Sequence, residues 1–261
     1  MRALSIAATG MTAQQMRVEV ISNNLANMST TAFNTRRAEF ADLHYQKVEQ
    51  PGTLSASDGT MIPTGIQLGL GVRTASVAPE LAQGALTQTN GDLDIAIEGR
   101  GYLEVALPDG SSAYTRDGGL KRSADGQVVN SEGYPLVPDI GIPDEAISLS
   151  INADGEVYAF FSDEPEPELL GQLTLASFTN ARGLEALGGN LFRETEASGP
   201  PNVGDPGTDG LGVMRQGYLE TSSVDAVREV TELIEAQRAY ELNAKVLTAA
   251  DQMMSTTSQV R

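Results

Sequence analysis

The sequence predicts an α+β protein in which N- and C-terminal helices form a coiled-coil-like helical domain, joined by an extended β connector to a mostly antiparallel β central domain. Apolar residues recur at alternating spacings of three and four near both ends of the chain, which is typical of helices that pack along one seam. The middle alternates apolar and polar residues between Asp-Gly pairs, which is typical of strands joined by hairpin turns.

The C-terminal segment Ser223–Val260 contains no glycine or proline, although the chain has 27 and 12 of them, so a long helix is expected there. Ser223 is the predicted N-cap, and Asp225 and Glu229 place negative charge near the positive end of the helix dipole. The predicted seam consists of Leu233, Ala236, Tyr240, Asn243, Leu247, Ala250, Met254 and Thr257. A second apolar line flanks it and consists of Leu242, Val246, Ala249, Met253 and Val260. Two apolar lines indicate that this helix has more than one partner.

The N-terminal segment is the expected partner, as a helix over residues 3–27. Its seam consists of Leu4, Ala7, Met11, Gln14, Val18, Ile21, Leu25 and Met28. An ordinary intramolecular helix pair is one interpretation of these patterns. Small residues off the seam, such as Ala8 and Ala13, favour packing against further copies instead, and the polar residues Gln14 and Asn243 are expected to set the register.

Residues 3–13 superficially resemble a short signal peptide. They are poor in leucine, however, and the seam runs through them without a break, so we expect the segment to be retained as part of the helix. Because no apolar run approaches the roughly 20 residues that span a bilayer, membrane insertion is not expected.

The central segment from Gly91 to about Phe178 is predicted to be an antiparallel β domain. Half-buried strands are expected where apolar residues alternate with polar ones, at Leu93, Ile95 and Ile97, at Leu103, Val105 and Leu107, at Ile147, Leu149 and Ile151, and at Val157, Ala159 and Phe161. Asp109-Gly110, Asp125-Gly126 and Asp154-Gly155 are the predicted hairpin turns, since glycine accepts the positive φ that these turns require.

Two segments enriched in glycine and proline separate these regions. Residues 46–75 are predicted to be a loop or long hairpin that ends with Ile66, Leu68, Leu70 and Val72 in alternation, and residues 199–212 are linker-like. The expected division is a helical domain from 1–30 and 223–261, a connector from 31–75 and 200–222, and a β-rich outer domain from 76–199.

The formal net charge of −18 is concentrated in the middle of the chain, where residues 51–222 hold 8 basic and 25 acidic side chains. Such a segment repels phosphate, which argues against nucleic acid as a partner and favours an exposed outer surface. The run Asp163–Glu168 is expected to be a solvated acidic loop. The chain has no cysteine, and therefore no disulfide or thiolate site.

No motif indicates a catalytic, cofactor or metal site. His44 is the only histidine and has no second histidine or cysteine to complete a metal site. The run 152–156 resembles part of a calcium loop but lacks the ligand series, so a hairpin turn is expected, and Gly99-Arg100-Gly101 precedes a strand, whereas a dinucleotide loop opens a helix.

Three strings resemble the bacterial flagellar axial proteins, the rod and hook family: SNNLANMSTTAFNTRRAEF from Ser22, QGYLETSSVD from Gln216, and EAQRAYELNAKVL from Glu235. The signature positions that carry the resemblance are Asn23, Asn24, Leu25, Ala26, Asn27, Phe33, Gln237, Arg238, Ala239 and Tyr240. One position departs from the family pattern, because Ala32 stands where glycine is usual.

The connector ending IPTGIQLGLGV is similar to that of distal-rod members. The resemblance implies a structural subunit, not an enzyme, that polymerises into a helical tube across the periplasm and transmits torque from motor to hook. It also implies export by the flagellar type III apparatus without a cleaved signal peptide, and contacts with proximal-rod proteins, the hook protein and surrounding ring proteins. The alternatives are a proximal-rod or hook protein, or a secreted fibrous adhesin. Self-assembly is expected through Leu4, Met11, Gln14, Val18, Ile21 and Leu25 with Leu233, Tyr240, Asn243, Leu247 and Met254.

Overall fold

A computed structural model describes residues 2–48, 65–162 and 166–259, which form two compact units. Unit 1 takes its residues from 1–26, 36–79 and 225–261, and unit 2 from 27–35 and 80–224. Parts of three predictions lie outside the described residues, namely Val260 of the second apolar line, residues 49–64 of the connector and residues 163–165 of the acidic loop. The side chain of Thr257, in the predicted seam, also lies outside the description.

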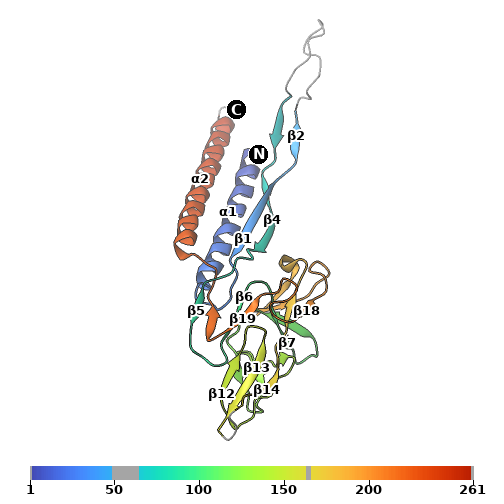
Figure 1. Ribbon diagram of the computed structural model, residues 1–261. Coiled ribbons are helices and arrows are strands. Elements are labelled where there is room, and N and C mark those ends of the chain that lie inside the picture. The colour runs from blue at the N-terminus through green and yellow to red at the C-terminus, as the bar shows by residue number, and fades with distance from the viewer. Residues whose placement is uncertain (1, 49–64, 163–165, 260–261) are drawn as a thin grey trace. The chain divides into compact units, whose positions relative to one another are not determined.

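Unit 1 contains two long helices and a hairpin of four strands (Figure 1). Its elements are α1 (Arg2–Ala26), β1 (Arg36–Asp42), β2 (Tyr45–Lys47), β3 (Gln67–Gly69), β4 (Val72–Pro79) and α2 (Ala226–Gln259). In the hairpin β1 pairs with β4 and β2 with β3, both antiparallel, as expected for a long hairpin. The apolar residues Ile66, Leu68 and Leu70 at its far end are exposed.

The helix α2 begins at Ala226, two residues later than a cap at Ser223 predicts, because Asp225 is the capping residue. Its Oδ1 accepts hydrogen bonds from the backbone N–H groups of Val227 at 3.0 Å and Arg228 at 3.2 Å. The prediction of Ser223 as the N-cap is therefore wrong. Its hydroxyl oxygen accepts a hydrogen bond from the backbone N–H of Thr35 at 2.9 Å, within unit 2. A carboxylate also suits the positive end of the helix dipole.

Unit 2 is built almost entirely of antiparallel strands. Its elements are β5 (Leu86–Gln88), β6 (Ile95–Glu98), β7 (Leu103–Ala106), β8 (Ser112–Thr115), β9 (Lys121–Arg122), β10 (Val128–Val129), β11 (Leu136–Val137), β12 (Ala146–Ile151), β13 (Glu156–Phe161), β14 (Glu168–Gln172), β15 (Leu175–Ser177), the short 3₁₀ helix η1 (Ala181–Gly183), β16 (Glu185–Gly188), β17 (Leu191–Arg193), β18 (Asn202–Gly204), β19 (Val213–Gln216) and β20 (Tyr218–Glu220). The larger sheets have the orders β11-β7-β8-β17-β16 and β12-β13-β14, and the remaining pairs are β9–β10, β15–β18, β6–β19 and β5–β20. The prediction of two terminal helices and a mostly antiparallel central region is confirmed.

The larger of two hydrophobic clusters in the described part of unit 2 includes Ile95, Ile97, Leu103, Val105, Val157 and Leu175, and the smaller one contains Tyr102, Tyr114 and Ala176. The alternation in β7 is confirmed, since Leu103 and Val105 are buried and Glu104 is only partly so. The half-buried assignment is wrong for β6, where Ala96 is buried as well, so both faces of this strand are covered. It is also wrong at Ile147, which is exposed because the pairing register shifts between Ala146 and Ser148.

The three predicted Asp-Gly turns are confirmed. Gly110, Gly126 and Gly155 each have a φ of +82° and join consecutive antiparallel strands. The glycine- and proline-rich run 199–212 is more ordered than its composition suggests, because it contains β18 and buries Leu211 in the core.

Ala32 adopts a left-handed backbone conformation with a φ of +54°. It is buried, and its backbone N–H donates a 2.8 Å hydrogen bond to the carbonyl oxygen of Glu220. This conformation costs an L-residue with a Cβ about 1 to 2 kcal/mol of conformational free energy, whereas glycine adopts it without that cost. The turn geometry therefore explains a preference for glycine at this position, and alanine carries strain there.

The Ala32→Gly variant should be more stable than the original chain by about 1 kcal/mol, because it removes this strain. Thermal unfolding of unit 2, followed by circular dichroism, measures the change. The matched control is Ala124→Gly, at an exposed turn position without a positive φ, which should be neutral or slightly destabilising. Equal destabilisation by both variants would contradict the assignment of strain to Ala32.

Candidate assembly site

The two helices of unit 1 lie side by side and run in opposite directions (Figure 1). Arg17 of α1 forms an ion pair with Glu232 of α2 at 3.3 Å, and a Cβ added to Gly10 would lie 3.1 Å from the side-chain amide nitrogen of Asn243. Early residues of α1 therefore meet late residues of α2, and both chain ends lie at the same end of the pair.

The contact between the helices is made largely by small residues. Ala7 and Ala13 of α1 and Ala236 and Ala250 of α2 are buried, and Gly10 faces Asn243 without a side chain between them. Small residues let helix backbones approach closely, but each of them buries little apolar area. The pair is therefore close-packed but leaves most large apolar side chains of α2 uncovered.

A buried polar cluster joins the last turn of α1 to the first turns of α2 and to β1. The side-chain nitrogen of Asn24 donates to Glu229 Oε2 at 3.1 Å and to the carbonyl oxygen of Arg36 at 2.8 Å, while its Oδ1 accepts from the backbone N–H of Arg36 at 2.9 Å. Asn24 is 1% exposed and Glu229 is 6% exposed. Because buried polar groups are costly without partners, this cluster allows only one arrangement of the three elements.

The residues predicted for self-assembly are only partly covered in the single chain. Of the α1 set, Ile21 is buried, whereas Leu4, Met11, Gln14, Val18 and Leu25 are half-buried. Of the α2 set, Leu233, Asn243 and Leu247 are half-buried, whereas Tyr240 and Met254 are exposed. Gln14 Oε1 is buried and accepts no hydrogen bond from any described residue.

The family-signature residues have different environments. Asn24 is buried in the polar cluster, Leu25, Asn27, Phe33 and Ala239 are half-buried, and Asn23, Ala26, Gln237, Arg238 and Tyr240 are exposed. The burial of Glu229 was missed, because a carboxylate near a helix start was interpreted only as a dipole partner. The seven-residue spacing of Glu229, Ala236, Asn243 and Ala250, which places them on one side of α2, was the available signal.

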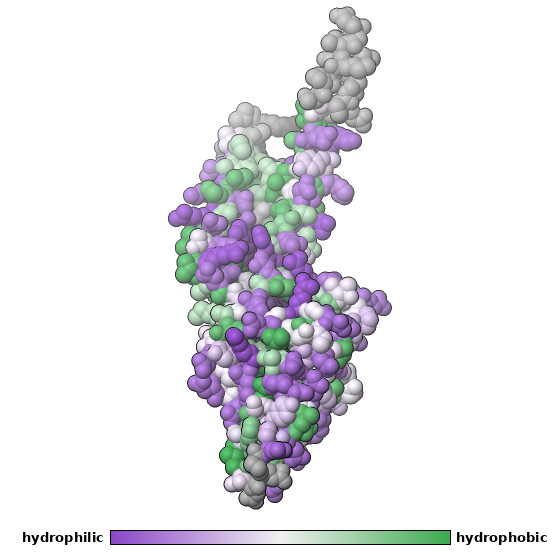
Figure 2. Space-filling model, viewed as in Figure 1, coloured by the Kyte–Doolittle hydropathy of each residue, from purple (hydrophilic) through white to green (hydrophobic). Residues whose placement is uncertain are grey.

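Large apolar side chains are exposed along α2. Leu242 is 62% exposed and Val246 is 52% exposed, and the set also contains Val227, Val230, Ile234, Tyr240, Met253 and Met254. Figure 2 shows apolar side chains gathered over the helices of unit 1. Soluble monomers rarely leave so many large apolar side chains of one helix in water. This exposed set, which we call the apolar face of α2, is a candidate interface.

Unit 2 has its own buried polar joint. Arg116 Nη2 donates to Glu220 Oε2 at 2.8 Å, and its Nη1 donates to the carbonyl oxygens of Gly99 at 3.1 Å and Gly101 at 3.0 Å. Glu220 Oε1 accepts from the backbone N–H of Gly84 at 3.0 Å, and Glu220 is 4% exposed. The ion pair thus joins β20 to the end of β8, to the β6–β7 loop and to the segment before β5.

The described residues contain no group of three or more His, Cys, Asp or Glu side chains arranged to hold a metal ion. His44 is exposed. Asn152 Oδ1 accepts from the backbone N–H groups of Asp154 and Glu156, which confirms a hairpin turn between β12 and β13. Gly99-Arg100-Gly101 lies between the strands β6 and β7, as expected. Neither described helix combines the length and apolar character needed to cross a membrane.

Three family models match different parts of the chain. A model of flagella basal body rod proteins matches residues 4–33, a model of the D1 domain of the flagellar hook proteins FlgE/F/G matches residues 96–159, and a model of the C-terminal region of the flagellar basal body rod proteins FlgEFG matches residues 215–260. The matches cover α1, much of the β-rich centre and α2. They define a class, the axial proteins of the flagellar rod and hook.

Curated relatives extend the match to the full length. The flagellar basal-body rod protein FlgG of Caulobacter vibrioides is 50% identical over 100% of both chains, that of Agrobacterium fabrum is 47% identical over 99% of both, and that of Bacillus subtilis is 34% identical over 97% of both. The chain belongs to the flagellar basal-body rod protein family, and its relatives are of the distal-rod type that FlgG represents. These comparisons confirm the prediction of a structural rod subunit, not an enzyme, and do not favour the alternatives.

The Asn24→Ala variant should lose about 2 to 4 kcal/mol of stability, because it leaves the Glu229 carboxylate buried without its amide partner. Denaturant unfolding followed by far-ultraviolet circular dichroism measures the loss of helix. The control is Ser22→Ala, at an exposed position two residues earlier, which should change stability by less than about 0.5 kcal/mol. Similar losses in both variants would contradict the role given to the polar cluster.

Replacing Arg116 by methionine should destabilise unit 2 by about 3 to 5 kcal/mol, because Glu220 would then be a buried charge without a counter-ion. The double variant Arg116→Met/Glu220→Leu should recover much of that loss, since it removes both charges. Tyrosine fluorescence during denaturant unfolding measures both effects. A double variant that is less stable than Arg116→Met would show that the pair is needed for more than charge compensation.

Proposed function

We propose that the chain is a subunit of the distal rod that polymerises into a helical tube, which spans the periplasm and transmits torque from the motor to the hook. The observation that carries this proposal is the apolar face of α2, which the single chain leaves exposed in a member of a rod protein family. A polymer covers such a surface with equivalent helices of neighbouring copies.

The incomplete burial of the predicted seam supports coiled-coil-like packing between copies. Within one chain the helices meet mainly through alanine and glycine, so the half-buried Leu4, Met11 and Leu247 remain available to a neighbour. Gln14 lies on this seam and is half-buried, and a polar residue in such a seam selects one register of the assembled helices.

The helical part of the chain begins at Arg2 and includes the segment that resembles a signal peptide. Because Ala7 and Ala13 are buried in the helix pair, cleavage after this segment would remove part of the proposed interface. We therefore propose that the segment is retained and that the chain is exported through the flagellar type III apparatus without a cleaved signal. The proposed neighbours in the basal body are the proximal-rod proteins at one end of the tube and the hook protein at the other.

The acidic character of residues 51–222 suits a rotating part. A surface of one sign of charge limits adhesion to surrounding proteins, so the β-rich part of the chain is the proposed side that faces the ring proteins of the basal body.

Leu242→Asp should abolish rod assembly, because it places a charge in the apolar face of α2 that the polymer must bury. The measurement is electron microscopy of basal bodies from a deletion strain that expresses the variant. Stubs that retain the proximal rod but lack distal rod and hook are expected, as in the deletion strain itself. Complete hooks on normal rods in the deletion strain would contradict the proposed function.

Thr248→Asp is the matched control for this experiment. Thr248 is exposed six residues after Leu242, about 120° around the same helix from it, and the substitution makes the same change in net charge. Basal bodies with this variant should be complete. Purified Leu242→Asp chain should keep its unfolding midpoint, since Leu242 is 62% exposed in the single chain. Normal rods with Leu242→Asp would exclude the apolar face as the interface.

A further inference from the structure

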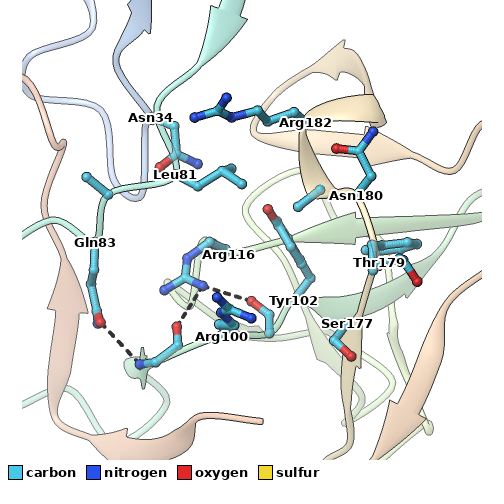
Figure 3. Close-up of a pocket in the computed structure, with 15 residues that line it drawn as sticks. Asn34, Leu81, Gln83, Arg100, Tyr102, Arg116, Ser177, Thr179, Asn180 and Arg182 are labelled. Atoms are coloured by element: carbon cyan, nitrogen blue, oxygen red, sulfur yellow. Dashed lines mark hydrogen bonds between the residues drawn. The ribbon is translucent and has the colours of Figure 1, made fainter. Parts of the chain in front are cut away.

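Unit 2 contains a pocket of about 360 Å³ beside the buried Arg116–Glu220 pair (Figure 3). Its walls come from the segment before β5, the β6–β7 loop and the residues from β15 to η1. Arg100, Tyr102 and Arg182 line it, and Figure 3 shows the side chain of Arg182 extending over the pocket towards Asn34. The exposed side chain of Leu81 adds an apolar patch at this site.

Two of the three arginines that line this pocket, Arg100 and Arg182, are not neutralised by an ion pair with a described residue. In unit 2 four arginines form ion pairs, namely Arg116 with Glu220, Arg122 with Asp144, Arg193 with Glu185 and Arg215 with Glu98. Arg100, Lys121 and Arg182 form no ion pair with any described residue. Two of these three unpaired cations line the same pocket, in a segment where acidic residues outnumber basic ones about threefold.

The pocket also has an unused hydrogen-bond donor. Tyr102 is 6% exposed, and its hydroxyl forms no hydrogen bond with a described residue. Burial raises the pKa of this hydroxyl above its ordinary value, so that it remains protonated. The ring is held over Arg116, with 5.9 Å between the guanidinium carbon and the ring centroid. Two guanidinium groups and a phenol donor around one cavity fit carboxylates, the acceptors that arginine binds most strongly.

We propose that this pocket binds the exposed segment Glu166–Leu169 of a second copy of the chain. The proposal rests on the proposed function, because it assigns a further contact between subunits of the polymer. Glu166 and Glu168 are exposed and form no ion pair with a described residue, and Glu166 lies at a bend just before β14 begins at Glu168. Pro167 between them restricts the segment, which lowers the entropy lost on binding.

The position of this segment in unit 2 supports a contact between different copies. Its last two residues, Glu168 and Leu169, begin β14, an edge strand of the sheet β12-β13-β14, and Leu169 is 52% exposed and matches the apolar patch at Leu81. Figure 1 shows β12, β13 and β14 at the end of unit 2 away from β18, whose partner β15 leads into the pocket. Two complementary surfaces at different places on one unit make a head-to-tail contact, which generates open helical assemblies.

Site-directed cross-linking tests the contact directly, because the chain has no cysteine of its own. One full-length chain carries Thr179→Cys, at an exposed position that lines the pocket, and a second, tagged chain carries Pro167→Cys. After mixing and mild oxidation, a mixed disulfide dimer is expected on non-reducing gels. Its yield should exceed that of the control pair Ala124→Cys with Pro167→Cys, another exposed site in unit 2, at least about fivefold.

Charge reversal identifies the groups responsible. Adding Arg182→Glu to the Thr179→Cys chain should reduce the mixed dimer to the control yield, and Glu166→Lys with Glu168→Lys in the partner should restore it. Lys121→Glu makes the same charge change outside the pocket and should leave the yield unchanged. A mixed dimer no more abundant than the control, or insensitive to Arg182→Glu, would overturn the proposal. Because the cross-link is measured on purified chains, such a result together with normal rods in cells would leave the proposed function intact.

Discussion

The buried hydrogen bond between Asn24 and Glu229 is the constraint on which unit 1 depends, because it joins residues that are 205 positions apart in the sequence. The same asparagine holds the backbone of Arg36 through two further hydrogen bonds, so one side chain sets the relative positions of α1, α2 and β1. Apolar contacts made by alanine and glycine are not directional and would tolerate sliding of the helices. A satisfied polar cluster at the base of the pair removes that freedom.

This joint also explains how a weakly packed helix pair can exist before assembly. The small residues between the helices bury little apolar area, and helices in water depend on tertiary contacts for most of their stability. The polar cluster and the Arg17–Glu232 ion pair hold the helices in position, while the large apolar side chains of α2 remain outside. The residues that fix the pair in one chain are therefore distinct from the residues that are available to join copies.

Much of the fold followed from patterns that depend only on local sequence. The seam spacing identified both helices and the Asp-Gly pairs located three hairpins, because helix and turn geometry impose these patterns directly. Errors arose where tertiary contacts decide. Asp225, and not Ser223, caps the helix because the Ser223 hydroxyl is hydrogen-bonded to Thr35. Ala96 is buried because β6 is covered on both faces. Ile147 is exposed because the pairing register shifts beside it. Arg116, Glu220 and the pocket beside them carried no local signal, since their segments meet only in the folded unit.

The two candidate contacts differ in physical character, and this difference matters for a rod that must assemble in order and then bear torque. The apolar face of α2 contributes non-directional attraction that depends on buried area and responds little to salt. The arginine-lined pocket contributes a directional contact between charged groups, which is strong only in one relative orientation of the subunits and weakens as ionic strength rises. An assembly held by the apolar contact alone could slip between neighbouring registers under load. A charged contact at a second place on each subunit opposes that slippage, because moving by one register would separate the carboxylates from their guanidinium partners.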